Sequence, residues 1–293
     1  MFRTASHEMF KLKLLGLLRP LMVAGMILLG AGVVHAATYT YTGNSNTYLD
    51  SNGSCAAGGG GTNLWSDPRN WAPPCGNAGP PGPGDSATIG DFTVNVDTNV
   101  TVGDLTFSPA ATSGNAIYVS NNATLTSTGT FTWIAGGLGN APGYGVTTPS
   151  GTFHIAPGGQ WVISGAADKR FSESFDTVIN DGSATWSGGN IHLYQSGNKP
   201  AITNNGTFTA TTDASLIEDT AIGLDPIGFV NNGTFRKTGG GGITNVSWAF
   251  TNHGLVDAQM GSIALAGGIE NGGMNGYAHI HDGTFNAAAG ATG

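Results

Sequence analysis

The residues best suited to acid–base chemistry lie together in one short stretch. Lys169 and Arg170 form an adjacent basic pair, and Glu173 and Asp176 follow a few positions later. A polysaccharide lyase needs a base and a group that neutralises the carboxylate of its substrate, so these four residues are the strongest catalytic candidates in the chain. A basic pair in a loop is more often part of the solvated surface, and we therefore assign no catalytic residue.

Acidic residues gather in two places, from Glu173 to Asp181 and from Glu218 to Asp225. Hydrolysis of a glycoside requires two carboxylates across the scissile bond, and either stretch could contribute to such a pair. Both stretches lie in segments that we expect to be long loops between strands, where solvated charge is the ordinary explanation. The acidic residues alone therefore do not predict a glycosidase.

Metal and cofactor motifs are not evident. His279 and His281 share one face of an expected strand, but no third ligand stands at a suitable spacing. The chain has no Gly-x-Ser-x-Gly elbow and no phosphate-binding Gly-Lys-Ser/Thr loop. We predict no metal site and no cofactor.

Cys55 and Cys75 are the two cysteines of the chain. Thiols of an exported protein can oxidise, and we expect these two to form a disulfide. A loop of that length would contribute on the order of 3 kcal/mol to the free energy of unfolding.

The first 36 residues have the three parts of a secretory signal. Basic residues precede an uncharged apolar run from Leu21 to Val34, and Val34-His35-Ala36 forms a small-residue cleavage pattern. The apolar run is too short to span a bilayer comfortably. We predict that residues 1–36 are a cleaved signal peptide, that no membrane span follows and that the protein is secreted or held at the cell surface.

Removal of this segment leaves six basic and seventeen acidic residues, a net charge of 6 − 17 = −11. Nucleic-acid binding depends on clustered Lys and Arg that neutralise phosphates, so this balance argues against a nucleic-acid partner.

A repeat organises the remainder of the chain. Seven segments align on a glycine, at Gly129, Gly151, Gly182, Gly206, Gly233, Gly254 and Gly283. The second residue after each glycine is apolar, as in Phe208 and Phe235, and four consecutive segments have Asn two residues before it, at Asn180, Asn204, Asn231 and Asn252. Units of this length match one turn of a solenoid, and one turn alone cannot bury its apolar face. We predict that Phe stacks on Phe and Asn on Asn in successive turns.

The predicted fold is therefore all-β, a right-handed parallel β-helix over residues 85–293. Residues 37–84, with Trp65 and Trp71, are expected to form an irregular N-terminal cap. A β-sandwich with long hairpins is the structural alternative. The last repeat has no second strand and no polar cap after it, so we expect the chain to continue beyond Gly293 in the intact protein.

Several segments resemble the repeat tracts of bacterial filamentous-haemagglutinin-like and autotransporter-like surface proteins. They include FVNNGTFRKTGGGGITNVSWAFTNHGLVDAQMGSIALAGG and the opening NLWSDPRNWAPPCGNAGPPGPGDSATIGDFTVNVD. The resemblance implies a β-helical fold and a role in adhesion, surface structure or display of a binding surface. Unlike an autotransporter, the chain contains no terminal membrane barrel.

Two functions are compatible with these features. The first is a non-catalytic, adhesin-like or structural solenoid whose partners are glycans or host or cell-surface molecules. The second is a carbohydrate-active β-helix of the lyase or glycosidase type, with Trp186 or Tyr194 stacking on a sugar ring. An enzyme should gather acidic and basic groups with perturbed pKa in one cleft, whereas a structural rod should scatter them.

Overall fold

A computed structural model describes residues 36–43, 48–49, 55–56, 63–72, 79–111, 114–139, 151–171, 177–193, 201–219, 228–266, 279–280 and 284–288, with only the backbone at 48–49, 55–56 and 279–280. The chain divides into two compact units, residues 1–36 and 37–293. The predicted signal peptide falls almost wholly outside the described residues. Among the described residues, no helix is long and apolar enough to cross a membrane.

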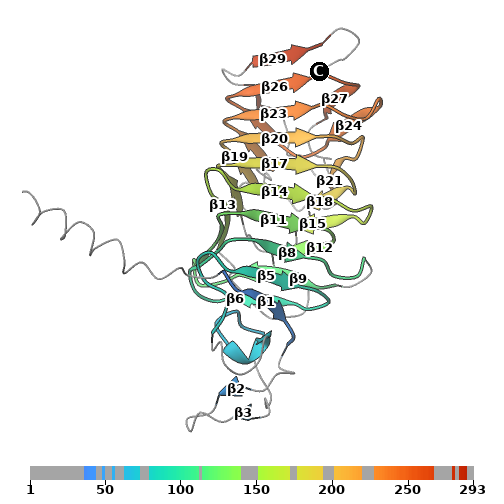
Figure 1. The fold of residues 1–293 in the computed structure, drawn as a ribbon. Helices are drawn as coiled ribbons and strands as arrows, with labels where there is room; N and C mark the ends of the chain where they lie inside the picture. Colours follow the sequence, from blue (N-terminus) through green and yellow to red (C-terminus); the bar gives the residue numbers. More distant parts are fainter. Residues whose placement is uncertain are drawn as a thin grey trace, which may run out of the picture. The chain divides into compact units, whose positions relative to one another are not determined.

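Three large sheets contain most of the described strands of the second unit, and the described residues include one short 3-10 helix at Pro68–Asn70 (Figure 1). Sheet 1 contains, in spatial order, β29 (Thr284–Ala287), β26 (Leu255–Ala258), β23 (Thr234–Lys237), β20 (Thr207–Ala210), β17 (Ser183–Trp186), β14 (Gln160–Ile163), β11 (Thr130–Trp133), β8 (Leu105–Phe107), β5 (Ser86–Ile89), β1 (Thr38–Tyr41) and β4 (Trp71–Ala72).

Sheet 2 contains β28 (His279–Ile280), β25 (Phe250–Asn252), β22 (Phe229–Asn231), β19 (Ile202–Asn204), β16 (Thr177–Asn180), β13 (Thr152–Ile155), β10 (Thr124–Ser127) and β7 (Val100–Val102). Sheet 3 contains β27 (Ser262–Leu265), β24 (Ile243–Val246), β21 (Leu216–Glu218), β18 (Ile191–Leu193), β15 (Lys169–Phe171), β12 (Gly136–Leu138), β9 (Ala116–Val119) and β6 (Val94–Val96). A separate antiparallel pair joins β2 (Tyr48–Leu49) and β3 (Cys55–Ala56).

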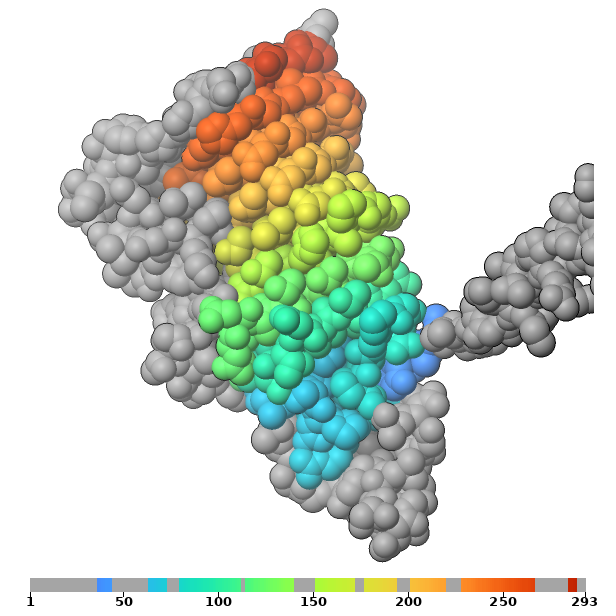
Figure 2. All heavy atoms as spheres, turned by 90° about the vertical axis from the view of Figure 1, so that its left-hand side faces the viewer, coloured from blue at the N-terminus to red at the C-terminus, as the bar shows by residue number. Residues whose placement is uncertain are grey.

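The chain visits sheets 3, 2 and 1 in turn, so that every third strand lies beside its predecessor in the same sheet. From β5 onward the pairing is parallel, as in β20 with β23 and β22 with β25. This confirms the predicted parallel β-solenoid and contradicts a sandwich of hairpins, whose consecutive strands would pair antiparallel. Successive turns lie in layers from the blue to the red end of the chain (Figure 2). The right-handed sense of the coil stays a prediction.

Stacked aromatic rings fill the interior. The rings of Phe208 and Phe235 stack with centroids 5.5 Å apart and planes 14° apart, and both side chains are fully buried. Phe229 and Phe250 stack in sheet 2 in the same way, at 5.2 Å. The predicted stacking of Phe on Phe is therefore confirmed. Because a turn has no core of its own, these contacts between turns hold the stack together.

The glycine alignment is wrong for one turn. Gly151 precedes β13, which lies in sheet 2 between β10 and β16, whereas the other aligned glycines precede strands of sheet 1. The equivalent glycine is Gly159, which precedes β14 in sheet 1. The sequence spacing misleads here because the turn at residues 156–159 is longer than the corresponding turns elsewhere. Phe153 accordingly pairs with Leu125 and Val178 in the column of sheet 2.

Aromatic residues of the predicted cap segment close the first turns. β1 already joins sheet 1 by parallel pairing with β5, and β4 pairs antiparallel with β1. Trp65 and Trp71 are buried with ring centroids 4.5 Å apart, and the Trp71 indole donates a hydrogen bond to the Trp65 carbonyl. Sheet 1 therefore includes a strand from the predicted cap segment, whereas the repeating order of sheets 3, 2 and 1 starts at β6. Cys75 and the side chain of Cys55 lie outside the described residues, so the disulfide stays a prediction.

Candidate functional site

Strand alternation separates the two basic candidates. Lys169 and Arg170 are consecutive in β15, so their side chains point to opposite faces of sheet 3. Lys169 is 1% exposed and lies inside the solenoid, whereas Arg170 is half-buried on the outer face. The two side chains therefore do not converge on one site.

Backbone carbonyls hold the Lys169 ammonium at the corner between sheets 1 and 3. Its Nζ donates to the carbonyls of Ala167 at 2.9 Å, Gly188 at 3.1 Å and Gly165 at 3.3 Å. Burial lowers the pKa of Lys169 from 10.5 to about 8, against the opposing effect of the Asp168 carboxylate. The group therefore remains mainly charged at neutral pH, and its bonds assign it a structural role.

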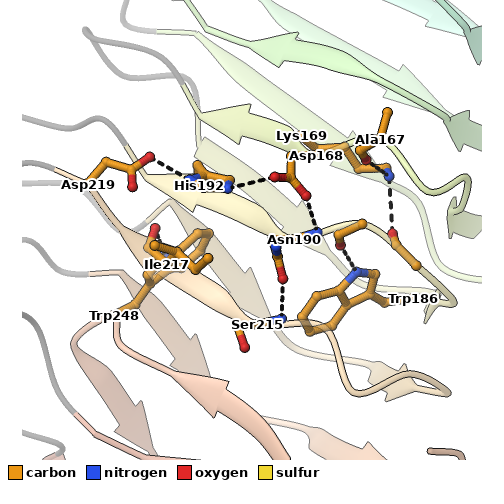
Figure 3. A network of polar contacts seen from close by, with 12 residues as sticks. Ala167, Asp168, Lys169, Trp186, Asn190, His192, Ser215, Ile217, Asp219 and Trp248 are labelled. Atoms are coloured by element: carbon orange, nitrogen blue, oxygen red, sulfur yellow. Dashed lines mark hydrogen bonds and ion pairs between the residues drawn. The ribbon is translucent and has the colours of Figure 1, made fainter. Parts of the chain in front are cut away.

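His192 lies between two carboxylates on the outer face of sheet 3 (Figure 3). Its Nδ1 lies 2.5 Å from Asp219 Oδ2, and its Nε2 lies 3.2 Å from Asp168 Oδ2. A carboxylate oxygen accepts hydrogen bonds, so each ring nitrogen of His192 faces an acceptor. We call these three residues the His192 clamp. It ties together three adjacent turns, because the residues lie at β15, β18 and β21.

The clamp is anchored further along the same surface. The other oxygen of Asp168 accepts the backbone N–H of Asn190 at 2.9 Å, and the Asn190 side chain accepts the N–H of Ser215 at 2.9 Å (Figure 3). With both ring nitrogens occupied, His192 is not arranged as a general base for a bound substrate.

A hollow of about 360 Å³ opens beside the clamp. Its lining comprises Ala111, Ala167, Asp168, Lys169, Arg170 and His192. Arg170 is the register neighbour of His192 in the adjacent strand. Arg69 and Arg236 pair with Asp67 and Asp257, whereas Arg170 has no hydrogen bond or ion pair to any of the described residues. The hollow therefore has a guanidinium on its lining.

Glu218 is a buried carboxylic acid inside the stack. It is the register neighbour of Leu193, is 5% exposed, and its Oε2 has no hydrogen-bond partner among the described residues. Burial raises the pKa of Glu218 from 4.5 to about 7. Sheet 3 is interrupted here, because β21 pairs with β24 only at Leu216. The Trp248 indole N–H donates a hydrogen bond to the Ile217 carbonyl at 3.0 Å. Glu218 therefore faces the interior and not the hollow.

The remaining ion pairs are dispersed over the stack. His154 contacts Asp181 at 2.8 Å on sheet 2, Arg236 contacts Asp257 at 2.9 Å on sheet 1, and Lys237 contacts Asp213 at 2.6 Å at a corner. Hydrogen bonds from Asn205 and His154 lower the pKa of Asp181. Within the described ranges, no group of three or more His, Cys, Asp or Glu residues is arranged to hold a metal ion.

The predicted site is only partly visible. Glu173, Asp176 and Tyr194 lie outside the described residues, as do the side chains of His279 and His281. Trp186 cannot stack on a sugar, because its ring is fully buried and its indole donates to the Gly189 carbonyl. That expectation was wrong because Trp186 occupies an inward position of β17.

Sequence reasoning missed the His192 clamp and the buried Lys237. A signal for the clamp was present, because Asp168, His192 and Asp219 follow one another at about the length of one repeat. Residues separated by one repeat lie side by side in a solenoid.

Comparison of the chain with models of protein families, with curated proteins and with solved structures found no match.

Proposed function

We propose that the chain is a non-catalytic, exported β-solenoid, adhesin-like or structural, that displays a binding surface. The single observation that carries the proposal is that Lys169 and His192, beside the hollow, are already bonded to other groups of the protein. Lys169 is bonded to carbonyls inside the stack, and both ring nitrogens of His192 face carboxylates. Among the described residues, this leaves no acid–base pair directed into the hollow.

The dispersed ion pairs support the same proposal. Charged groups on all three sheets pair between neighbouring turns, which is the pattern expected of a rod stabilised along its length. The signal-like segment at residues 1–36 and the resemblance to repeat tracts of bacterial surface proteins support export and display. Glycans or other cell-surface molecules are the partners that fit this role.

A carbohydrate-active enzyme is the second candidate. The observation in its favour is the hollow itself, whose volume of about 360 Å³ falls in the range of small-molecule sites and which has Arg170 on its lining.

The two functions are separated by assaying the mature protein on acidic polysaccharides and following unsaturated products by their ultraviolet absorbance. We expect no turnover together with measurable binding to immobilised glycans or cells. Turnover that is abolished in Arg170→Ala and Lys169→Ala, and kept in Arg236→Ala on sheet 1, would overturn the proposal. Thermal unfolding of each variant separates loss of a site from loss of the fold.

A further inference from the structure

The lining of the hollow has two cationic side chains, Lys169 and Arg170, and one carboxylate, Asp168, in a chain with a net charge of −8 when histidines are counted as neutral. Lys169 is buried, whereas Arg170 is half-buried on the outer face of sheet 3. Asp168 contacts His192, as does Asp219, which is not part of the lining. The lining therefore favours an anion, although acidic residues outnumber basic ones in the chain.

Arg170 has the chemistry to select the kind of anion. The guanidinium presents a planar fork of donors that matches a carboxylate with two parallel hydrogen bonds. Strands β12 and β18 flank β15 on both sides and fix the backbone beneath Arg170.

The neighbours of Arg170 suit a hydroxylated ligand. The lining also includes Ala111 and Ala167, whose side chains are small. The Asp168 side chain is 54% exposed at the same place, so its oxygens can also accept hydrogen bonds from ligand hydroxyls. A group that offers a carboxylate and hydroxyls together is a sugar acid.

We propose that Arg170 binds the carboxylate of a uronic-acid residue of an acidic glycan, with the sugar lying in the hollow beside the His192 clamp. This inference rests on the proposed display function and names its ligand class. The carboxylate pairs with the guanidinium, and Asp168 accepts a ring hydroxyl. The site binds without reaction, because neither Lys169 nor His192 is free to take a proton from the sugar.

The probe is a trimer of galacturonic acid, titrated calorimetrically into the full chain at physiological salt. The matched neutral probe is the methyl ester of the same trimer, which keeps the rings and hydroxyls and removes the charge. We expect the free acid to bind at least tenfold more tightly than the ester. Arg170→Gln should weaken binding of the acid by ten- to a hundredfold, as expected for loss of a charged hydrogen-bonded pair. Arg170→Lys should bind the acid with an affinity between those of the parent chain and Arg170→Gln, because a lysine ammonium cannot form two parallel hydrogen bonds to the carboxylate.

Two further variants keep the inference falsifiable. Ala111→Glu leaves Arg170 in place and adds a negative charge to the lining, so it should weaken binding of the acid and leave the ester unchanged. Arg236→Gln removes an arginine that is already paired with Asp257 on sheet 1 and should bind like the parent chain.

Equal affinity for acid and ester, unchanged binding in Arg170→Gln, or no binding of the acid by the parent chain overturns the uronate site. These results leave the display function standing if the chain still binds cells or other glycans. Cleavage of the trimer would instead overturn the non-catalytic function while the carboxylate contact of Arg170 stood. Tighter binding of a sulfated trisaccharide than of the uronate would assign the site to sulfate.

Discussion

The side-chain amide of Asn204 donates a hydrogen bond to the side-chain oxygen of Asn231, one turn further along the stack, at 2.8 Å. Both side chains are fully buried. Asn180 donates to Asn204 at 2.7 Å, and Asn231 donates to Asn252 at 2.7 Å, so four turns share one internal ladder of amides. This confirms the predicted stacking of Asn on Asn. Each amide also donates to a backbone carbonyl, as Asn204 does to Thr234 at 3.0 Å.

Removing one rung of this ladder should be costly. Asn204→Ala deletes the bonds to Asn180 and Asn231 and leaves their amide groups buried without those partners. We expect the free energy of unfolding to fall by about 2–4 kcal/mol in urea titrations. The control is the next residue, Asn205, which bonds Asp181 and Asn232 on the exposed surface. Asn205→Ala should cost less than about 1 kcal/mol, and equal losses would show that burial is not the cause.

The aromatic stack offers a second test. Phe235→Ala removes a fully buried ring that contacts Phe208, Phe229 and Phe250, and it should lower the free energy of unfolding by roughly 3–5 kcal/mol. Phe285 stands in the same column of sheet 1 and is 37% exposed, so Phe285→Ala should cost about 1 kcal/mol or less. A loss of under about 1 kcal/mol in Phe235→Ala would contradict the stacked interior.

The aligned glycines that precede the strands of sheet 1, such as Gly206, should not tolerate a side chain. A Cβ at Gly206 would overlap the carbonyl oxygen of Gly182 in the turn before, and this oxygen belongs to the backbone and cannot rotate away. Gly206→Ala should therefore cost about 2–4 kcal/mol or prevent folding. Gly90 has open space around the same position, so Gly90→Ala should unfold within about 0.5 kcal/mol of the parent chain. Circular dichroism during urea unfolding measures both.

Glu218 should make the stability of the fold depend on pH. The folded chain binds the Glu218 proton more tightly than the unfolded chain, because burial raises the pKa from 4.5 to about 7. The contribution of Glu218 to stability is therefore greatest below pH 4.5, falls as the pH rises from 4.5 to about 7, and levels off above that. The loss from this group is on the order of 2–3 kcal/mol.

Glu218→Gln keeps the shape and removes the titration, so the difference in unfolding free energy between the two proteins should grow from pH 5 to pH 8. Subtracting the two curves cancels the other titrating groups. A constant difference would show that the carboxyl is solvated.

The apolar pattern was sufficient to predict the stack. Apolar residues alternate with polar ones after each glycine, and this alternation predicted that Phe208 and Phe235 lie inside. The Asn residue repeated two positions before the glycine predicted the ladder of amides. The pattern failed at Gly151, because Ser-Gly-Thr-Phe-His-Ile in sheet 2 imitates the segments of sheet 1, and only the pairing of Phe153 with Leu125 distinguishes them.

The candidate site was harder to predict. The polar surroundings of Lys-Arg-Phe at residues 169–171 indicate a loop, yet the segment is a strand whose alternation places Lys169 and Phe171 inside and Arg170 outside. The same alternation in Leu216, Ile217 and Glu218 places an acid in the interior, against the usual preference of carboxylates for water. Distant pairs such as Asp168 and His192 become neighbours only when the turns are aligned correctly.

The corners of the coil differ in how they can change over evolutionary time. Only Asn205 and Gly206 separate β19 from β20 between sheets 2 and 1, whereas residues 139–151 separate β12 from β13 between sheets 3 and 2. Insertions at the second kind of corner leave the pairing of the strands intact, and duplication or loss of a whole repeat only lengthens or shortens the stack. A lineage of such genes can therefore diversify one edge of the protein and adjust its reach while inheriting the same layered interior.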